Sequence, residues 1–322
     1  MGFTRALGFF RAPAQAQAPA GMVRVPGGAF TMGSNRFYPE ERPAHPAHVD
    51  GFLMDRAPVT NAQFSAFVAA TGYVTLAERV PDPARYPGVP ADRLVPGSLV
   101  FAPRADGLHR GPADWWRYVP GASWRHPQGP GSDLVGREDH PVVHVAYADA
   151  AAYAAWAGKR LPSEAEWEFA ARGGLKAAEY AWGTELSPSG RRMAHIWPGG
   201  PFPRHAGEIP PGTAAVGLYP ANGFGLLDMI GNVWEWTSDW YGTRHLAPEA
   251  AGEAGGKPAC CMARAASLDP AQPDLPIPRK VLKGGSFLCA PDFCQRYRPA
   301  ARQPQMIDSA SCHIGFRCVS DA

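Results

Sequence analysis

Two cysteines near the C-terminal end of the chain have a spacing that suits metal or redox chemistry. Cys289 and Cys294 are five positions apart in the segment Cys-Ala-Pro-Asp-Phe-Cys. Their side chains would point about 140° apart on an α-helix and to opposite faces of a strand. Because proline fixes its own φ and keeps the residue before it out of the helical region, Ala290-Pro291-Asp292 predicts a turn. Such a turn would bring both sulfur atoms to one point.

A structural interpretation of the same cysteines is also open. A free cysteine often acts as a small buried hydrophobe, and two of them need not meet. Lys283, Arg296 and Arg298 flank the pair. A cation close to the thiols would favour the thiolates, whereas a cation paired with a carboxylate elsewhere in the fold would have a structural role.

A second group of residues suits a hard cation. The segment 222–236 concentrates glycine, aromatic residues and carboxylates, among them Asp228 and Glu235. Ca²⁺ takes oxygen ligands from carboxylates and backbone carbonyls and tolerates irregular geometry. Acidic residues beside glycine are also common in turns, so this segment alone indicates calcium only weakly.

Capping signals predict three helices that would position these segments. Two of the helices begin with a capping box, formed by Thr60 with Gln63 and by Ser163 with Glu166. A glycine follows the last turn of each helix, as is common at helix ends. The predicted helices run from Thr60 to Gly72, from Ala148 to Ala157 and from Ser163 to Gly173.

Strand signals are fewer. Residues 23–25 and 29–32 predict two short strands around a Pro-Gly-Gly turn, and residues 140–145 predict a buried strand. His140 and His144 lie on one side of that strand without a cysteine or carboxylate at ligand spacing, so we expect structural roles for them.

The remaining segments lack a sustained hydrophobic period. Residues 80–141 are rich in Pro, Gly and Asp, but their tryptophans favour an ordered functional surface over disorder. Residues 194–217 are also irregular, and residues 247–266 resemble an inserted loop that carries Cys260 and Cys261. No internal repeat is present.

Composition excludes several classes of protein. With 31 basic and 29 acidic residues, the formal net charge of +2 implies no nucleic-acid partner. Gly and Pro make up 71 of 322 residues, whereas a hydrophobic content of 45% and an aromatic content of 11% argue against disorder. The chain should fold compactly with many turns.

The chain shows no targeting or membrane-spanning segment. The apolar run between Arg5 and Arg11 is too short for a signal peptide, and no run reaches the 18 residues of a membrane span. We therefore expect a cytoplasmic protein with a disordered N-terminal extension at residues 1–21 and a single domain at residues 22–322. A reducing compartment would keep most of its six cysteines as thiols.

Several sequence blocks together resemble the formylglycine-generating enzymes, also called sulfatase-modifying factors. Most of these blocks specify a fold that is shared with relatives of other or no activity, so the cysteine pair is the discriminating element. The blocks are Val25–Gly28 with Met32-Gly33, Pro58–Phe67, His140–Val143, Gly158–Gly174, Gly231–Trp236, Gly284–Arg302 and Gly315–Cys318.

The resemblance implies both a fold and a reaction. The fold is an α+β, C-type-lectin-related domain with little regular secondary structure. The reaction is a copper- and O₂-dependent oxidation of a cysteine to Cα-formylglycine, within a Cys-x-Pro-x-Arg motif of an unfolded sulfatase polypeptide. A monomer is expected.

The resemblance also assigns site residues. Cys289 and Cys294 match the family's two copper ligands, and Ser286 and Trp234 match residues that line its oxygen and substrate pocket. Cu(I) is soft and accepts thiolates, and two sulfur ligands leave room for the substrate thiolate.

Two calcium sites are implied by position. One maps to Asp228, Gly231, Val233 and Glu235. The other maps to His195, Ile196, Glu208 and Pro210, where His195 replaces an asparagine oxygen donor with an imidazole that Ca²⁺ does not favour. This replacement counts against a second calcium ion.

Three further departures from the family pattern bear on function. Phe293 stands where tyrosine is common, and His313 stands where asparagine is usual. Both departures would alter the oxygen step or the substrate contacts. Ala171 replaces a cysteine of some secreted relatives and leaves Cys318 without that partner, in agreement with a cytoplasmic protein.

Two alternatives to the copper oxidase follow from the shared fold. An iron-dependent sulfoxide synthase would require an additional helical domain with a histidine cluster, and only about 20 residues precede the first matching block. An inactive or binding-only paralogue is the other alternative, and the presence of both thiols counts against it.

Overall fold

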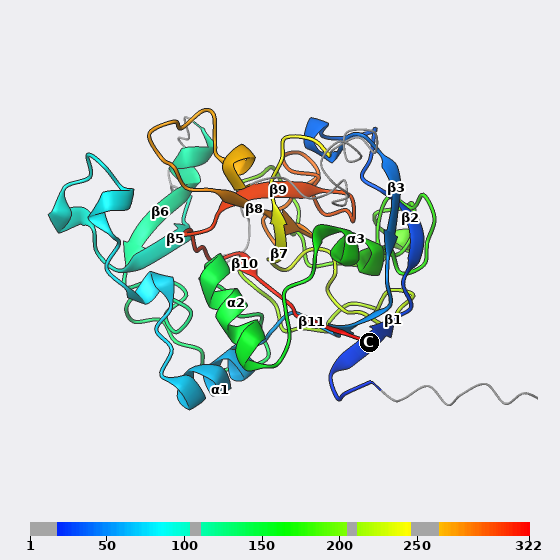
Figure 1. Ribbon diagram of the computed structural model, residues 1–322, viewed down its shortest axis with the longest axis horizontal. Coiled ribbons are helices and arrows are strands. Elements are labelled where there is room, and N and C mark those ends of the chain that lie inside the picture. Colours follow the sequence, from blue (N-terminus) through cyan, green and yellow to red (C-terminus); the bar gives the residue numbers. More distant parts are fainter. Residues whose placement is uncertain (1–17, 104–110, 205–210, 246–263) are drawn as a thin grey trace, which may run out of the picture.

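The structure, a computed structural model, describes residues 18–103, 111–204, 211–245 and 264–322 (Figure 1). Three helices cover part of a body made mainly of short strands and loops. The helices are α1 (Asn61–Thr71), α2 (Tyr147–Trp156) and α3 (Glu164–Arg172). The strands are β1 (Met22–Val25), β2 (Gly28–Met32), β3 (His45–Val49), β4 (Phe52–Asp55), β5 (Gly97–Phe101), β6 (Trp116–Pro120), β7 (Trp234–Trp240), β8 (Arg279–Lys283), β9 (Arg302–Met306), β10 (Ile314–Gly315) and β11 (Val319–Asp321).

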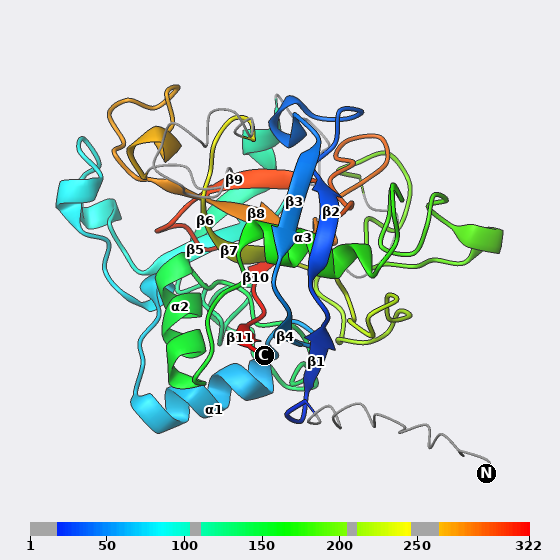
Figure 2. The same cartoon turned by 45° about the vertical axis from the view of Figure 1, so that its right-hand side comes forward.

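Four small sheets organise the described strands. A four-stranded sheet has the order β10-β7-β8-β9, and a three-stranded sheet has the order β1-β4-β11. The second sheet brings β1 and β11, the first and last of the described strands, together on either side of β4 (Figure 2). Two-stranded sheets join β2 to β3 and β5 to β6. This mixture of helices and small sheets confirms the predicted α+β class.

The predicted helix ends are confirmed. The Thr60 side chain accepts a hydrogen bond from the Gln63 amide, and Gly72 ends α1 in the left-handed region at φ 66°. Ser163 and Glu166 form the capping box of α3, and Gly173 follows at φ 57°. These signals are local, so they act in the same way wherever the helix packs.

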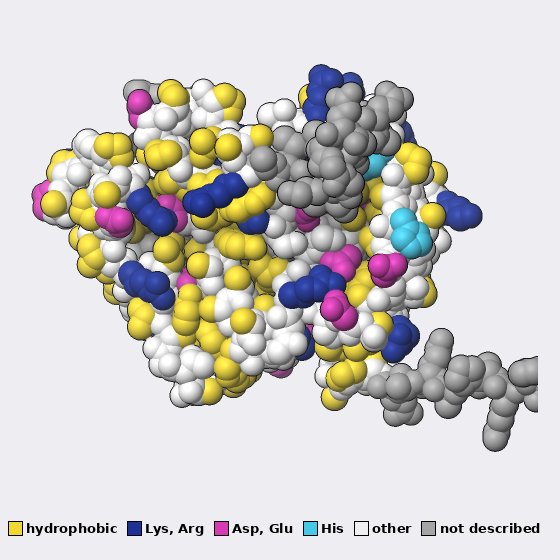
Figure 3. Space-filling model, viewed as in Figure 1, with side chains coloured by type: hydrophobic (Ala, Val, Ile, Leu, Met, Phe, Trp, Pro, Cys, Tyr) yellow, Lys and Arg dark blue, Asp and Glu magenta, His cyan; other side chains and the backbone are white. Residues whose placement is uncertain are grey.

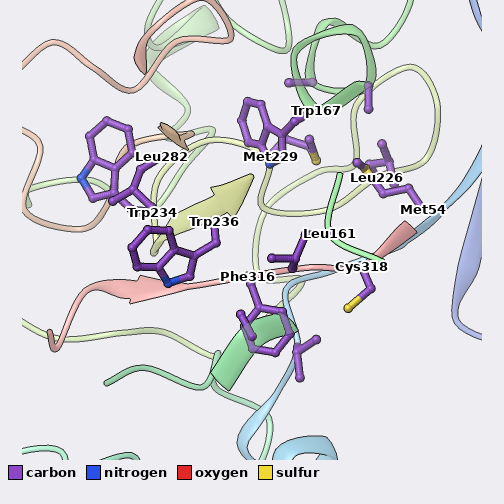
Figure 4. Packing of buried hydrophobic residues seen from close by; sticks show 14 of the residues in the cluster. Met54, Leu161, Trp167, Leu226, Met229, Trp234, Trp236, Leu282, Phe316 and Cys318 are labelled. Atoms are coloured by element: carbon purple, nitrogen blue, oxygen red, sulfur yellow. The ribbon is translucent and has the colours of Figure 1, made fainter. Parts of the chain in front are cut away.

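The core gathers residues from distant parts of the sequence (Figure 4). Trp167 of α3, Trp236 of β7, Leu282 of β8 and Phe316 are each fully buried. Burial of aromatic side chains of this size supplies much of the hydrophobic stabilisation that a loop-rich chain needs.

Two strand predictions are wrong in detail. Residues 141–145 are buried, but the segment forms only an isolated bridge between Pro141 and Thr60. His144 has φ 59°, a left-handed conformation that interrupts an extended strand. In addition, β1 and β2 do not form a hairpin, because β1 pairs with β4 and β2 with β3.

The segment 80–141 has more regular structure than its sequence indicates. It contains the antiparallel pair β5–β6, in which Gly97 lies opposite Pro120 and Phe101 lies opposite Trp116. Trp115 and Trp124 are buried, which agrees with the expectation of an ordered segment.

Charges of both signs are interspersed on the face shown in Figure 3. This distribution agrees with the small net charge of the chain. Among the described residues, no helix is long and apolar enough to cross a membrane.

Candidate functional site

The loop after β8 begins with two glycines that its path requires. Gly284 and Gly285 have φ angles of 95° and 75°, in the left-handed region. A Cβ atom on Gly284 would lie 3.0 Å from the Trp167 ring, and one on Gly285 would lie 3.0 Å from the Arg296 carbonyl oxygen. The loop can therefore fold closely against α3 and against its own return segment.

The predicted convergence of the two cysteines is confirmed. The Sγ atoms of Cys289 and Cys294 lie 3.4 Å apart, and both residues are buried. The Cys294 amide donates a 2.8 Å hydrogen bond to the Ala290 carbonyl, which closes the turn between them. Both thiols are free, and their separation is less than twice a metal–sulfur bond length of about 2.3 Å. One soft metal ion can therefore contact both sulfur atoms.

The environment of the pair favours one thiolate. The hydrogen bond from Cys289 and the Arg296 guanidinium lower the pKa of Cys294 to about 6. The same hydrogen bond, together with burial, raises the pKa of Cys289 well above its ordinary value. At neutral pH the pair therefore holds a thiolate and a thiol, and binding of a metal by both sulfurs must release the remaining proton.

Of the three cations that flank the pair, one lies beside a thiol and the other two pair with carboxylates elsewhere in the fold. Arg296 Nη1 lies 4.0 Å from Cys294 Sγ, while its Nη2 donates to Glu40 at 2.6 Å. Arg298 makes two hydrogen bonds to the Glu41 carboxylate. Lys283 pairs with buried carboxylates of α3. Only Arg296 contributes its charge directly to the cysteine pair.

Ser286 contacts the pair directly, whereas Trp234 shares only the main hydrophobic core with it. The Ser286 amide points to Cys289 Sγ at 3.4 Å, and its buried hydroxyl accepts from the Leu288 amide. Trp234, in β7, belongs to the same hydrophobic cluster as both cysteines. The structure therefore brings Ser286 against one sulfur and places Trp234 in the core of the domain.

An aromatic wall adjoins the cysteine loop, and the sequence did not reveal it as a unit. We use this name for Phe293, Phe202 and Trp115. Phe293 is 47% exposed, and its ring stacks on Phe202 at 4.5 Å between centroids. The Trp115 ring contacts Phe202 and Phe293 edge-on, each at 4.9 Å. Asp292 accepts a hydrogen bond from the Phe202 amide and so ties the two loops together.

His313 is buried against Trp116, which follows Trp115 of the aromatic wall in the chain. Its ring lies 4.8 Å from the Trp116 ring, and a 2.8 Å hydrogen bond joins its Nδ1 to Ser311 Oγ. Burial, with a smaller effect of His144, lowers the pKa of His313 to about 3. His313 is therefore neutral at physiological pH.

The residues predicted to bind the first calcium ion lie around Arg317. The Glu235 carboxylate accepts from Arg317 Nε, Arg317 Nη2 and Trp167 Nε1. Asp228 Oδ2 accepts from the Gly217 amide, and its backbone carbonyl accepts from Arg317. A carboxylate offers about four acceptor positions, so each side chain retains capacity for a cation. The Arg317 guanidinium already lies against these oxygens, so a calcium ion here stays a prediction.

The second calcium site is not supported by the residues that the structure describes. The His195 Nε2 atom is joined to the Gly212 carbonyl by a 2.8 Å hydrogen bond. The Ile196 carbonyl accepts from the Arg192 guanidinium at 2.9 Å, which places a positive charge where the ion would bind. Glu208 and Pro210 lie outside the described residues.

The other candidate residues have structural partners. Hydrogen bonds join His140 to Thr213, and His144 to Ser98 and Pro127, as expected for structural histidines. Within the described ranges, no group of three or more His, Cys, Asp or Glu side chains is placed to hold a metal. Cys312 and Cys318 are buried free thiols, whereas Cys260 and Cys261 lie outside the described residues.

Comparisons with known proteins agree with these features. Residues 9–322 match the family model described as "Sulfatase-modifying factor enzyme 1-like domain". The formylglycine-generating enzyme of Mycobacterium tuberculosis is 55% identical over 309 residues, covering 93% of this chain and 97% of that protein. The formylglycine-generating enzyme of Thermomonospora curvata is 47% identical over 313 residues, covering 94% of this chain and 93% of that protein.

Two further comparisons concern a relative that is named inactive and a solved structure. A mouse protein named inactive C-alpha-formylglycine-generating enzyme 2 is 37% identical over 316 residues, covering 95% of this chain and 87% of that protein. The solved structure of PvdO from Pseudomonas aeruginosa is similar with a TM-score of 0.58 at 25% identity, covering 94% of each chain. The fold is therefore shared by proteins with different names.

Proposed function

The chain belongs to the sulfatase-modifying factor family, and from this premise we propose that it oxidises a cysteine of a sulfatase to Cα-formylglycine. The observation that supports this proposal most strongly is the buried Cys289–Cys294 pair, whose sulfur atoms lie 3.4 Å apart. The bacterial relatives named formylglycine-generating enzyme, at 55% and 47% identity, support an oxidase activity. We further propose that the substrate is an unfolded segment with a Cys-x-Pro-x-Arg motif.

Copper(I) is the cofactor that this proposal assigns to the cysteine pair. When bound, it would supply a redox centre at which O₂ can accept electrons beside the substrate thiolate. Cys289 and Cys294 would hold the ion, and the Ser286 amide would direct Cys289 Sγ. Arg296 favours the thiolate form of Cys294, and burial of both sulfurs excludes bulk water.

The overall conversion can be balanced without specifying an intermediate. The substrate CH₂–SH group becomes CH=O, so its carbon loses two electrons and its sulfur leaves as sulfide. One O₂ accepts four electrons, so the other two must come from a reductant, such as a thiol. The balanced reaction is RCH₂SH + O₂ + 2e⁻ + 2H⁺ → RCHO + H₂S + H₂O.

Calcium has a structural role in this proposal. The candidate oxygens of Asp228 and Glu235 surround Arg317, whose segment leads into β11. A bound ion there would hold the loop before β7 against the C-terminal segment. It would thus stabilise the scaffold that supports Trp234 and the cysteine loop.

Conversion of a peptide tests the proposed function. The reduced, copper-loaded protein is incubated in air with a Cys-Thr-Pro-Ser-Arg peptide and a thiol reductant. We expect an aldehyde product, seen by mass spectrometry as replacement of H₂S by O. A peptide with serine in place of cysteine is the matched control. Absence of the aldehyde with copper, O₂ and reductant present would refute the proposal.

A binding-only protein on the same fold is the second candidate. The inactive mouse relative and the departures at Phe293 and His313 favour it. It predicts that the copper-loaded protein binds the peptide without oxidising it, so the same assay, combined with a binding measurement, separates the two candidates.

A further inference from the structure

One edge of β2 has no neighbouring strand among the described residues. The sheet that contains β2 has only one other strand, β3, and helix α3 contacts both strands. Figure 2 shows β3 along one side of β2, with the loop that follows α3 on the other side. An unpaired edge exposes backbone donors and acceptors, and an extended peptide can add to it as a new strand.

Backbone contacts indicate which groups of β2 point away from β3. The Gly33 amide donates to the Glu168 side chain, whereas the next amide, of Ser34, donates to the Glu41 carbonyl just before β3. Amide directions alternate along a strand, so Thr31 and Ala29 share the direction of Gly33. Thr31 also lies opposite Pro46, which has no amide hydrogen to donate. Ala29 and Thr31 therefore present their backbone groups to the open edge.

A groove runs along this open edge. Its volume is about 760 Å³, and residues 26–31 form one wall. The half-buried rings of Phe30, Phe169 and Phe224 also line it. Phe30 contacts Phe169 edge-on at 5.3 Å, and Phe169 stacks on Phe224 at 5.7 Å. The groove thus combines a free strand edge with an apolar, aromatic surface.

The charges that line the groove are mainly positive. Arg36 and Lys176 are exposed, and Arg172 and Arg298 lie deeper, each already paired with a buried glutamate. Glu179 is the one carboxylate among the described lining residues, and it lies 3.3 Å from Arg36. Three of the four cations already have a carboxylate partner, so an acidic ligand would meet mainly Lys176 and the exposed Arg36.

The groove ends close to the cysteine site. Phe37 lines the groove, and its ring lies 3.6 Å from the Arg298 guanidinium. The next residue, Tyr38, covers the Arg296 guanidinium at 3.9 Å, and Arg296 in turn lies against Cys294. An extended chain advances by about 3.3 Å per residue, so a few residues span from the groove to this site.

We propose that the groove binds an extended segment of the substrate polypeptide, flanking the modified cysteine, as a third strand beside β2. The segment would alternate apolar side chains, which contact the aromatic surface, with acidic side chains, which face Arg36 and Lys176. This inference rests on the proposed function, because it names a second contact region for the same substrate. It also gives a physical reason why an unfolded substrate is used, since a folded segment cannot add to a strand edge.

Steady-state kinetics with short and extended peptides test the proposal. The minimal Cys-Thr-Pro-Ser-Arg peptide is compared with peptides extended at either end by eight alternating glutamate and phenylalanine residues. We expect one extension to lower KM. Arg36→Glu and Lys176→Glu should each raise KM for that peptide about threefold to tenfold, with kcat and the minimal peptide unaffected. Arg191→Glu, at an exposed arginine that does not line the groove, is the control.

N-methylation of the peptide backbone tests strand addition without changing the protein. Methyl groups placed singly along the favoured extension should raise KM at alternate positions only, because every second amide faces β2. A uniform effect, or equal KM values for minimal and extended peptides, would overturn the proposal. If the extension binds to the protein but does not change KM, the groove serves a polypeptide other than the substrate, and this result would also overturn the proposal. Failure to oxidise even the minimal peptide would instead refute the proposed function.

Discussion

The Arg296 guanidinium lies 4.0 Å from the sulfur of Cys294. Its position is fixed from the other side, because its Nη2 donates to Glu40 at 2.6 Å and the Tyr38 ring lies 3.9 Å from its central carbon. A positive charge held at this distance stabilises a thiolate. The cysteine loop therefore depends on a segment more than 250 residues earlier in the chain for its electrostatic environment.

Replacement of Arg296 tests this dependence. Arg296→Met removes the charge, so we expect the pKa of Cys294 to rise from about 6 by about one unit. The measurement is thiolate absorbance of the metal-free, reduced protein against pH, with a Cys294→Ser variant as the blank. Burial raises the pKa of Cys312 to about 12, so Cys312 does not titrate in this range. Arg191→Met, at an exposed arginine, is the control. If the titration midpoint of Cys294 were the same in Arg296→Met as in this control, the hydrogen bond from Cys289 alone would set the pKa of Cys294.

The roles of the individual cysteines can be separated with a matched control. Cys289→Ser or Cys294→Ser should lower kcat/KM by more than about 100-fold and abolish copper binding, because one sulfur ligand is lost. Cys312→Ser is the control, since Cys312 is an equally buried thiol whose sulfur accepts from the Phe101 amide. Copper content by elemental analysis and activity are measured together. Full activity in either loop variant would contradict the assignment of the ligands.

The calcium prediction is best tested at Asp228. Glu235 is unsuitable, because its removal would leave the buried Arg317 without its carboxylate and destabilise the protein with or without calcium. In Asp228→Ala, which removes the side-chain oxygens, we expect loss of bound Ca²⁺ in elemental analysis. Calcium at a hundredfold its Kd should stabilise the native protein by about 2.7 kcal/mol, and the variant should lose this gain. Asp92→Ala, at an exposed aspartate, is the control. Equal calcium contents would exclude this site.

Short-range signals in the sequence are sufficient to predict the helix ends and the turn between the two cysteines. The capping boxes at Thr60 and Ser163 and the turn at Pro291 depend on residues a few positions apart, so their physics is contained in the local sequence. Convergence of Cys289 with Cys294 follows from the same local constraint.

Contacts between distant segments could not be predicted in this way. Phe202 joins Phe293 and Trp115 from separate loops, and no local pattern marks such a meeting. The strand predicted at residues 140–145 failed because His144 adopts a left-handed conformation, held by hydrogen bonds to Ser98 and Pro127. Tertiary contacts here override a hydrophobic pattern that by itself favours a strand.

Lys283, at the start of the cysteine loop, pairs with two buried carboxylates. Its Nζ lies 3.0 Å from Glu168 and 3.5 Å from Glu164, and all three side chains are almost completely buried. Burial alone would raise the pKa of Glu168, but Lys283 and Arg172 outweigh it and lower that pKa to about 2. Since the pKa is depressed below its unfolded value of about 4.3, the stabilisation is fully present above that pH. It is lost as the pH falls through about 2.

Lys283→Met should therefore destabilise the protein and make it more sensitive to acid. We expect the free energy of unfolding at pH 7 to fall by about 1–3 kcal/mol, because each buried glutamate loses one of its two cationic partners and keeps the other, Arg172 or Arg302. The acid transition should move to higher pH as the pKa of Glu168 rises. Urea unfolding at several pH values measures both effects. Lys176→Met, at an exposed lysine, should change stability by less than about 0.5 kcal/mol. An acid transition in Lys283→Met at the same pH as in the unchanged protein would show that Lys283 does not lower the pKa of Glu168.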